Sequence, residues 1–219
     1  KNKVTYIKGK GVVFSKNDVV VYGSNNSRSN IKAKNIVIAT GSEVASLPGI
    51  EIDEKNIVSS TGALSFDKVP KKLAVIGGGY IGLEMGSVWS RLGSDVTVIE
   101  YLDFITPGMD REVSNEFQKI LTKQGIKFKM GSKVNTVNSK GDFVTISYTD
   151  IKNSKEEKIE VDKVLVAVGR KPYTEGLNLS KIGVKLDNKG RIEINNKLQT
   201  SVENIYAIGD VIKGPMLAH

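Results

Sequence analysis

The segment KLAVIGGGYIGLEMGSVWSRLGSDVTVIE, residues 72–100, decides the fold. Its first five residues are almost wholly apolar, which predicts a strand buried on both faces of a parallel sheet. Residues 80–92 carry apolar side chains at helical spacing, and Gly93 suits the position just after a helix. Residues 95–100 predict a second strand. This strand–helix–strand order predicts an α/β fold with a doubly wound parallel sheet.

Three glycines, Gly77, Gly79 and Gly82, lie between the first strand and the helix with the spacing GxGxxG. The spacing alone is weak evidence, because glycines also mark plain turns. Here it follows a strand and opens a helix, which is the context of a dinucleotide-binding turn. The first glycine permits the tight turn, the second lets the backbone approach a pyrophosphate, and the third lets helix and strand pack closely. Free N–H groups at the helix start then face the phosphates.

Glu100 ends the second strand, about 20 residues after the turn, where an acid accepts hydrogen bonds from the adenosine ribose hydroxyls. A 2′-phosphate would meet its negative charge, and no arginine follows in residues 101–103. We therefore expect NAD rather than NADP. The alternative is a strand, turn and helix that bind no ligand. The glycine spacing, its place between a strand and a helix, and the acid at the end of the next strand together argue against this alternative.

Further elements are expected on both sides of this segment. An amphipathic helix is predicted at residues 110–124 and a hairpin-rich insert at 133–162, while residues 24–30 form a polar loop. Strands are predicted at residues 4–8, 11–15, 19–22, 35–39, 126–130, 163–168, 191–194 and 204–208. Trp89 and Phe117 fall on apolar helix faces, and we expect both in the core.

Three other strands end in small or polar residues: Ala39-Thr40-Gly41-Ser42, Val168-Gly169-Arg170 and Ile208-Gly209-Asp210. Ligands of open α/β sheets bind at the carboxyl ends of the strands. Each of these ends could be a simple turn, and Asp210 could be a turn residue or a cap. Taken together, they suggest a second nucleotide site.

Composition excludes several function classes. The chain of 219 residues has a formal charge of +8, but its lysines are scattered and no stripe of them alternates with aromatic residues, so we do not expect nucleic-acid binding. It has no cysteine, and its single histidine is His219, so neither a disulfide nor a zinc site is expected. No apolar run approaches the roughly 20 residues of a membrane span, and residues 1–4 lack a signal-peptide core. Because the chain opens in a strand pattern and stops within a motif, we expect it to be part of a longer protein.

Six stretches together resemble the pyridine nucleotide–disulfide oxidoreductases, in that family's order and over the whole chain. They are ATGS at 39–42, GGGYIGLEMGSVWSRLG at 77–93, VTVIE at 96–100, VAVGRKP at 166–172, IYAIGD at 205–210 and GPMLAH at 214–219. The resemblance implies a Rossmann-like NAD-binding domain at residues 47–172. It implies parts of an FAD-binding domain on either side, at residues 1–46 and 173–219.

The resemblance also implies site residues. The NAD contacts would be Gly77, Gly78, Gly79, Tyr80, Ile81, Gly82, Leu83, Glu84, Glu100, Val134 and Gly169. The FAD contacts would be Thr40, Gly41, Ser42, Asp210, Met216, Leu217, Ala218 and His219, with Asp210 on the ribityl-side hydroxyls. Tyr80 matches a residue that shields the flavin when nicotinamide is absent, and Glu84 matches an acid that pairs with a lysine beside the flavin. No catalytic residue is expected in this chain, because the family's cysteine pair precedes this region and its His–Glu acid–base pair follows it.

The match looks closest to the members that oxidise protein-bound dihydrolipoamide through a disulfide and FAD, with hydride transfer to NAD. This implies a homodimeric parent in the mitochondrial matrix that serves the lipoyl domains of 2-oxoacid dehydrogenase complexes. Members that use NADP are disfavoured by Glu100. Two alternatives stay open: an NADH-linked peroxidase or coenzyme A disulfide reductase of the same superfamily, and a non-catalytic NAD-binding module. We expect the 219 residues alone to bind NADH weakly, to retain little or no FAD and to lack lipoamide turnover.

Overall fold

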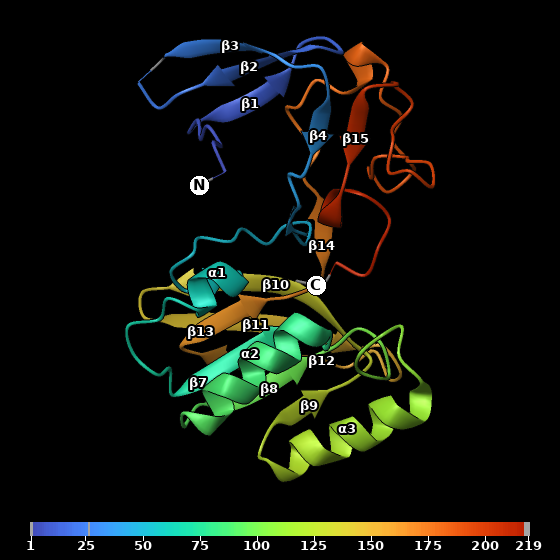
Figure 1. Ribbon diagram of the computed structural model, residues 1–219. Helices are drawn as coiled ribbons and strands as arrows, with labels where there is room; N and C mark the ends of the chain where they lie inside the picture. The colour runs from blue at the N-terminus through green and yellow to red at the C-terminus, as the bar shows by residue number, and fades with distance from the viewer. Residues whose placement is uncertain (1, 26, 217–219) are drawn as a thin grey trace. The chain divides into compact units, whose positions relative to one another are not determined.

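The computed structural model describes residues 2–25 and 27–216, and the chain divides into two units (Figure 1). The central unit is Val44–Gly169. The split unit combines Lys1–Glu43 with Arg170–His219. Each unit has its own hydrophobic cluster or clusters, and each is described here by itself.

The central unit contains a five-stranded sheet in which every neighbouring pair is parallel. In spatial order its strands are β6 (Ile57–Val58), β13 (Lys163–Val166), β7 (Lys72–Ile76), β8 (Asp95–Ile99) and β9 (Lys127–Lys129). From β7 the chain proceeds outward to β8 and β9, and later returns to the other side of β7 as β13. The strand order therefore reverses beside β7. Open α/β sheets bind ligands at such a switch point, beyond the carboxyl ends of the strands.

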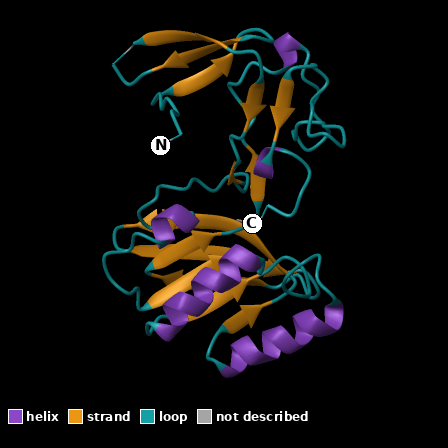
Figure 2. Ribbon diagram, in the orientation of Figure 1, coloured by secondary structure: helices purple, strands orange, loops and turns teal. Residues whose placement is uncertain are grey.

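Two different layers cover this sheet (Figure 2). Successive side chains of β7 alternate between these layers. Leu73 and Val75 pack with Leu83 and Leu121, on the face covered by α1 (Ser60–Ala63), α2 (Tyr80–Arg91) and α3 (Arg111–Lys123). Ala74 and Ile76 pack on the opposite face. That face is covered by an antiparallel sheet of β10 (Ser132–Lys140), β11 (Phe143–Asp150) and β12 (Glu156–Val161). The two central strands, β7 and β13, are apolar after their first residue because both of their faces are buried.

The helix boundaries follow from local sequence. Asp110 caps α3, since its side chain accepts hydrogen bonds from the N–H groups of Glu112 and Val113 at 2.8 and 3.3 Å. Ser59 caps the short α1 in the same way, through the N–H of Thr61 at 3.1 Å. In contrast, Gly79 caps α2 without any side chain, so the start of α2 has no such partner of its own.

The split unit contains three small sheets. An antiparallel sheet contains β1 (Lys10–Val13), β2 (Asp18–Tyr22) and β3 (Arg28–Lys32). A parallel pair contains β4 (Ile36–Ile38) and β15 (Ile205–Ala207), from opposite ends of the sequence. The pair β5 (Ser42–Val44) and β14 (Arg170–Pro172) completes the sheets. Two single-turn 3₁₀ helices, Ser180–Ile182 and Gly209–Val211, also occur in this unit.

Several predictions for the split unit were wrong. Residues 4–8 form no strand, and Val4 and Tyr6 are 84% and 82% exposed, so their apolar side chains have no buried face to pack against. The polar stretch at 24–30 runs into β3, which pairs with β2 in an antiparallel register. Residues 191–194 contribute only isolated bridges at Ile192. Val37 in β4 is exposed, so that strand is buried on one face within the unit.

Within the described ranges, no helix is long and apolar enough to cross a membrane.

Candidate nucleotide-binding sites

The glycine turn after β7 closes against the neighbouring strand β13. Gly77 has φ +107°, and a Cβ atom on it would lie 2.5 Å from the carbonyl oxygen of Ala167. A Cβ atom on Gly82 would run into the carbonyl oxygen of Gly77 and approach Val75 to 3.0 Å. Only glycine fits either position, so the backbone of the turn, the start of α2 and the end of β13 come together at the switch point.

Gly79 stands in a different environment from the other two glycines. A Cβ atom there would meet nothing within 4 Å, and its backbone is extended with φ −81°. The first bond of α2 runs from the N–H of Leu83 to the carbonyl of Gly79 at 3.0 Å. The N–H groups of Tyr80, Ile81 and Gly82 in the first helical turn therefore precede the first bond of the helix, and the space beside Gly79 is open. This arrangement suits an anionic group.

The Glu100 carboxylate ties the end of β8 to the glycine turn. It is buried, with the residue 8% exposed. Its Oε2 accepts the Gly78 N–H at 2.5 Å, and its Oε1 accepts the Leu102 N–H at 2.8 Å. The sequence predicts only the contact to sugar hydroxyls and misses these two bonds. A carboxylate offers about four lone-pair sites, so two accepted N–H bonds leave capacity for a ligand.

The loop after β8 is hydrogen-bonded to the same glycine turn. The N–H of Thr106 donates to the Gly78 carbonyl at 2.8 Å, while the N–H of Gly77 donates to the Ile99 carbonyl at 2.9 Å. Thr106 is 1% exposed, has φ +50° and shares a hydrogen bond with the Ser114 hydroxyl at 2.8 Å. The role of Thr106 was missed, since a backbone contact from a loop threonine leaves no pattern in the sequence.

The remaining residues expected to contact NAD differ in their burial. Gly169 follows β13 on the other side of the switch point, is exposed and has φ +132°. Val134 is half-buried in β10, two residues beyond Ser132, whose N–H donates to the Glu100 carbonyl at 2.8 Å. Glu84 is exposed on α2. The structure thus brings the ends of β7, β8 and β13 to one edge of the sheet.

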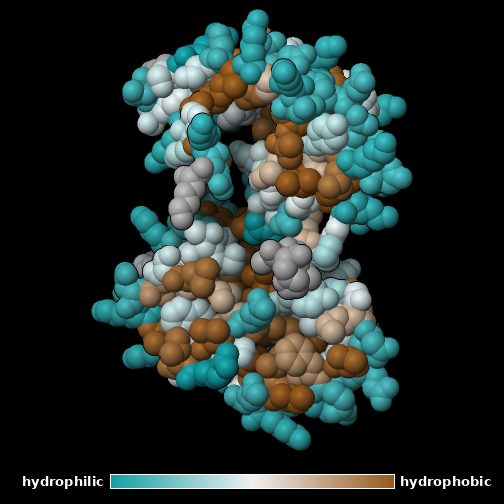
Figure 3. All heavy atoms as spheres, viewed as in Figure 1, coloured by the Kyte–Doolittle hydropathy of each residue, from teal (hydrophilic) through white to brown (hydrophobic). Residues whose placement is uncertain are grey.

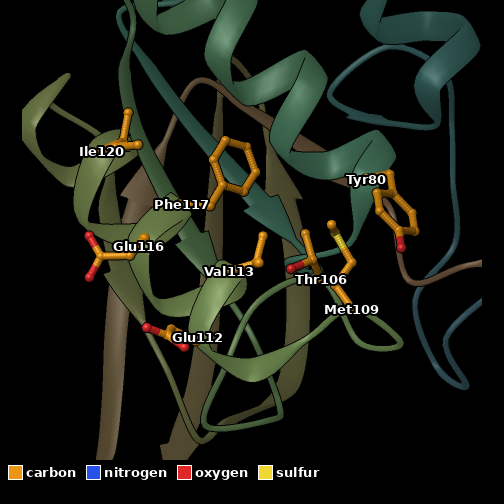
Figure 4. Close-up of a pocket in the computed structure, with 8 residues that line it drawn as sticks. All are labelled: Tyr80, Thr106, Met109, Glu112, Val113, Glu116, Phe117 and Ile120. Atoms are coloured by element: carbon orange, nitrogen blue, oxygen red, sulfur yellow. The ribbon is translucent and has the colours of Figure 1, made fainter.

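An open pocket of about 670 Å³ lies beside the start of α2 (Figure 4). Eight side chains line it: Tyr80, Thr106, Met109, Glu112, Val113, Glu116, Phe117 and Ile120. Tyr80 is 47% exposed and Phe117 is 37% exposed. The expectation that Phe117 is a core residue was therefore wrong, whereas Trp89 is half-buried and its ring lies 5.1 Å from that of Phe66. Apolar side chains also reach the surface of this unit in the space-filling view (Figure 3).

A polar cluster joins β9 to the antiparallel sheet. The Glu157 Oε2 accepts hydrogen bonds from the Tyr148 hydroxyl at 2.7 Å and from Lys129 Nζ at 3.0 Å. The Tyr148 bond, followed by the Lys129 bond and charge, lowers the pKa of Glu157. The hydrogen bond to Glu157 raises the pKa of Lys129, and burial raises the pKa of Tyr148. These hydrogen bonds link β9 of the parallel sheet to β11 and β12 of the antiparallel sheet.

A second candidate site lies at the carboxyl ends of β4 and β15 in the split unit. The two strands end together, because the Ile208 N–H donates to the Ile38 carbonyl at 3.0 Å. The Ser42 hydroxyl donates to Asp210 Oδ2 at 2.6 Å. The Thr40 hydroxyl donates to the Tyr173 carbonyl at 2.6 Å, and the Tyr173 N–H donates to the Gly41 carbonyl at 2.9 Å. The structure therefore joins two of the strand ends that the sequence singles out.

Two further features of this site concern residues at its margins. Arg170 contacts Ser42 through two hydrogen bonds of 2.6 Å, so the third strand end singled out in the sequence also reaches this site, although no sequence pattern predicts this particular contact. Met216 is half-buried, while Leu217, Ala218 and His219 lie outside the described residues. No group of three or more metal-ligating side chains occurs in residues 2–25 and 27–216.

Comparisons with known proteins agree in one family. The family model described as pyridine nucleotide-disulphide oxidoreductase matches residues 1–219. The chain is 56% identical over 220 residues to a dihydrolipoamide dehydrogenase of Chaetomium thermophilum, and 54% identical over 219 residues to a mitochondrial dihydrolipoyl dehydrogenase of Pisum sativum. Each match covers 100% of this chain and 44% of the relative, so the chain spans less than half the length of these proteins.

A solved structure shows the same fold. The HOCl-induced flavoprotein disulfide reductase RclA from Escherichia coli superposes with a TM-score of 0.85 at 28% identity. The superposition covers 96% of this chain and 46% of the other. The Rossmann-like α/β fold predicted from residues 72–100 is thereby confirmed. With the glycine turn at the switch point and a family match along its whole length, the chain belongs to the pyridine nucleotide-disulphide oxidoreductases.

Proposed function

We propose that the central unit binds NAD(H) and that the protein is an FAD- and NAD-dependent dihydrolipoamide dehydrogenase. The observation that carries the NAD assignment is the turn at Gly77 and Gly78, held by Glu100 at the switch point of the sheet. The identity of 54–56% to dihydrolipoyl dehydrogenases supports the choice of substrate. The substrate is proposed for the whole protein, since this chain spans less than half of those relatives.

The NAD diphosphate would lie over Gly79, where no atom stands in its way, against the N–H groups that begin α2. Glu100 would accept the hydroxyls of the adenosine ribose with the lone pairs that Gly78 and Leu102 leave free. The other proposed contacts are Gly77, Tyr80, Ile81, Gly82, Leu83, Glu84, Val134 and Gly169. A 2′-phosphate would face the Glu100 charge, so NADPH is expected to bind more weakly than NADH.

The residues of the split unit fit part of an FAD site. Thr40, Gly41, Ser42 and Asp210 lie at the ends of two parallel strands, and Asp210 is a half-buried carboxylate that can accept sugar-chain hydroxyls. A Cβ atom on Gly41 or Gly209 would meet nothing within 4 Å, which leaves room for a ligand at this edge. The proposed contacts continue through residues 216–219.

The proposed reaction oxidises a dithiol to a disulfide, delivers a hydride to NAD⁺ and releases a proton. Bound FAD and NAD supply the redox chemistry. This chain's residues would bind and orient the cofactors. The α2 amides and Glu100 would fix the dinucleotide and Asp210 would fix a sugar chain, while Tyr80, the exposed first residue of α2, lines the pocket beside that helix. With no cysteine among the 219 residues, the thiol chemistry itself belongs to groups outside them.

We further propose a homodimer in the mitochondrial matrix that accepts electrons from the lipoyl domains of 2-oxoacid dehydrogenase complexes. Relatives from Pisum sativum, Caenorhabditis elegans and Mus musculus carry the name mitochondrial dihydrolipoyl dehydrogenase.

A second candidate is another disulfide or peroxide reductase of the superfamily, which the likeness to RclA favours. The test is made on the protein expressed from its complete open reading frame. Its flavin content is read from visible absorbance, and NADH oxidation is followed with lipoamide, coenzyme A disulfide or hydrogen peroxide as acceptor. Bound FAD with lipoamide as the preferred acceptor is the expected result. A preference for peroxide or coenzyme A disulfide would replace the proposed substrate, and a colourless protein that binds NADH would leave a non-catalytic NAD module.

A further inference from the structure

Arg170, the first residue of β14, makes two hydrogen bonds to Ser42 in the candidate flavin site. Its Nε donates to the Ser42 hydroxyl at 2.6 Å, and its Nη2 donates to the Ser42 carbonyl at 2.6 Å. Ser42 and Arg170 are 128 residues apart in sequence and lie in the same unit. Two donors on one planar guanidinium fix both the backbone and the side chain of Ser42.

These bonds give the Ser42 hydroxyl a single orientation. A guanidinium has donors only, so the Ser42 Oγ must accept from Arg170. Its one hydrogen is then free to point to Asp210, whose Oδ2 lies 2.6 Å away. The three side chains therefore form a directed chain from Arg170 through Ser42 to Asp210. Chains of hydrogen bonds with charged ends are stronger and better oriented than neutral ones.

The chain of bonds occupies one oxygen of Asp210 and leaves the other available. Among the described residues, no donor reaches Asp210 Oδ1. Asp210 is half-buried, so Oδ1 can meet a ligand that lies over the ends of β4 and β15. Without the bond to Ser42, the carboxylate would be free to rotate about its side-chain torsions, and a ligand would have to immobilise it.

We propose that Arg170 is a positioning residue for FAD: through Ser42 it fixes the Asp210 carboxylate, so that Oδ1 is presented to a hydroxyl of the flavin nucleotide's sugar chain. The inference rests on the proposed FAD site and adds to it a residue that does not touch the ligand. The neighbouring Lys171 offers a matched control. Its Nζ lies 3.1 Å from Glu43 Oε1 in an exposed ion pair of the kind that contributes little to stability.

The test is a thermodynamic cycle on the protein expressed from its complete open reading frame. The flavin is removed, and the dissociation constant for FAD is measured by quenching of flavin fluorescence. The variants are Arg170→Gln, Asp210→Asn and the double variant, with Lys171→Gln as the control. We expect Arg170→Gln to raise the dissociation constant about tenfold. In the Asp210→Asn background the same change should alter it by less than about twofold, because the group that it positions is gone.

Two further variants keep the test decisive. Ser42→Ala should weaken FAD binding as Arg170→Gln does, and it replaces Asp210→Asn in the cycle if that variant binds too weakly to titrate. Arg170→Lys keeps the positive charge but not the two fixed donors of the guanidinium. Its FAD affinity should therefore lie between those of Arg170→Gln and the wild type. The thermal midpoint of each flavin-free variant, from circular dichroism, reports folding separately.

The possible contradictions are distinct. If Arg170→Gln lowers FAD affinity tenfold in both the wild-type and the Asp210→Asn background, Arg170 has a general structural role and the proposal is overturned. An equal loss of FAD affinity from Lys171→Gln would also overturn it. If the wild-type protein binds FAD but Asp210→Asn does not weaken it, the proposed contact of Asp210 fails and the positioning role fails with it. If the wild-type protein binds no FAD at all, the proposed function itself is wrong.

Discussion

The Gly78 N–H donates to the Glu100 carboxylate at 2.5 Å, which links the glycine turn after β7 to the acid at the end of β8. The two residues are 22 positions apart and carry the two halves of a dinucleotide site. The bond means that the acid and the turn are oriented together. A ligand therefore meets a preorganised edge, and less of its binding free energy goes into ordering side chains.

The first prediction separates the glycines that shape the fold from the one that admits the ligand. Gly82→Ala should lower the free energy of unfolding by about 1–3 kcal/mol, because the new methyl group runs into the Gly77 carbonyl. Gly79→Ala should change stability by less than about 1 kcal/mol, since its methyl group would meet nothing. It should nevertheless raise the dissociation constant for NADH about tenfold, by filling the space proposed for the diphosphate. Urea unfolding and NADH fluorescence titration measure both quantities.

Either of two results would count against that division. Gly79→Ala with unchanged NADH affinity would show that the diphosphate does not approach this residue. Gly82→Ala with unchanged stability would show that the helix and the turn pack less closely than the structure has them.

The second prediction concerns acid stability. The bonds from Tyr148 and Lys129 lower the pKa of Glu157 below its ordinary value of 4.5. The stabilisation from this carboxylate is therefore present above pH 4.5 and is lost as the pH falls through its lower folded-state pKa. Glu157→Gln should be less stable than the wild type near neutral pH, and the difference should shrink as the pH falls below 4.5.

Unfolding curves at several pH values test this, with Glu160→Gln on the same strand as the control. Glu160 is exposed and belongs to none of the ion pairs between described residues. A stability difference for Glu157→Gln that is constant with pH, or one that Glu160→Gln reproduces, would rule out the hydrogen-bonded carboxylate as its cause.

The third prediction is that the purified 219-residue chain binds NADH weakly, carries little or no FAD and does not reduce lipoamide. The reason is chemical, because the chain contains no cysteine to exchange with the substrate. A coupled assay with lipoamide and NADH, beside an NADH titration of the same sample, makes the measurement. Sustained turnover by the isolated chain would refute the assignment of the thiol chemistry to groups outside it.

The central unit could be predicted in detail because its signals are local. The apolar run of β7, the glycines after it and the helical spacing of α2 each have one structural solution, and the predicted strand 72–76 coincides with β7. The helix predicted at residues 110–124 likewise corresponds to α3, which spans Arg111–Lys123. Prediction succeeded where a residue pattern and the burial of both sheet faces require the same structure.

Sequence failed where the contacts are distant or depend on exposure. Thr106 braces the glycine turn through its backbone, and any residue type has that N–H. Arg170 reaches Ser42 across 128 residues, a contact that no spacing rule encodes. Phe117 sits on an apolar helix face that is open in the described part of the chain, so amphipathic spacing correctly predicts the helix but not the burial of that residue.

The central claim is that Glu100 and the glycine turn form one NAD(H) site, and the most direct test titrates wild type and Glu100→Gln with NADH and NADPH under identical conditions. The wild type should prefer NADH by at least about tenfold. Glu100→Gln removes the charge and one of the two N–H acceptors, so NADH should bind about tenfold more weakly while NADPH binding holds or improves. An NADH-to-NADPH preference that Glu100→Gln leaves unchanged, in a variant that unfolds at the same temperature as the wild type, would contradict the claim.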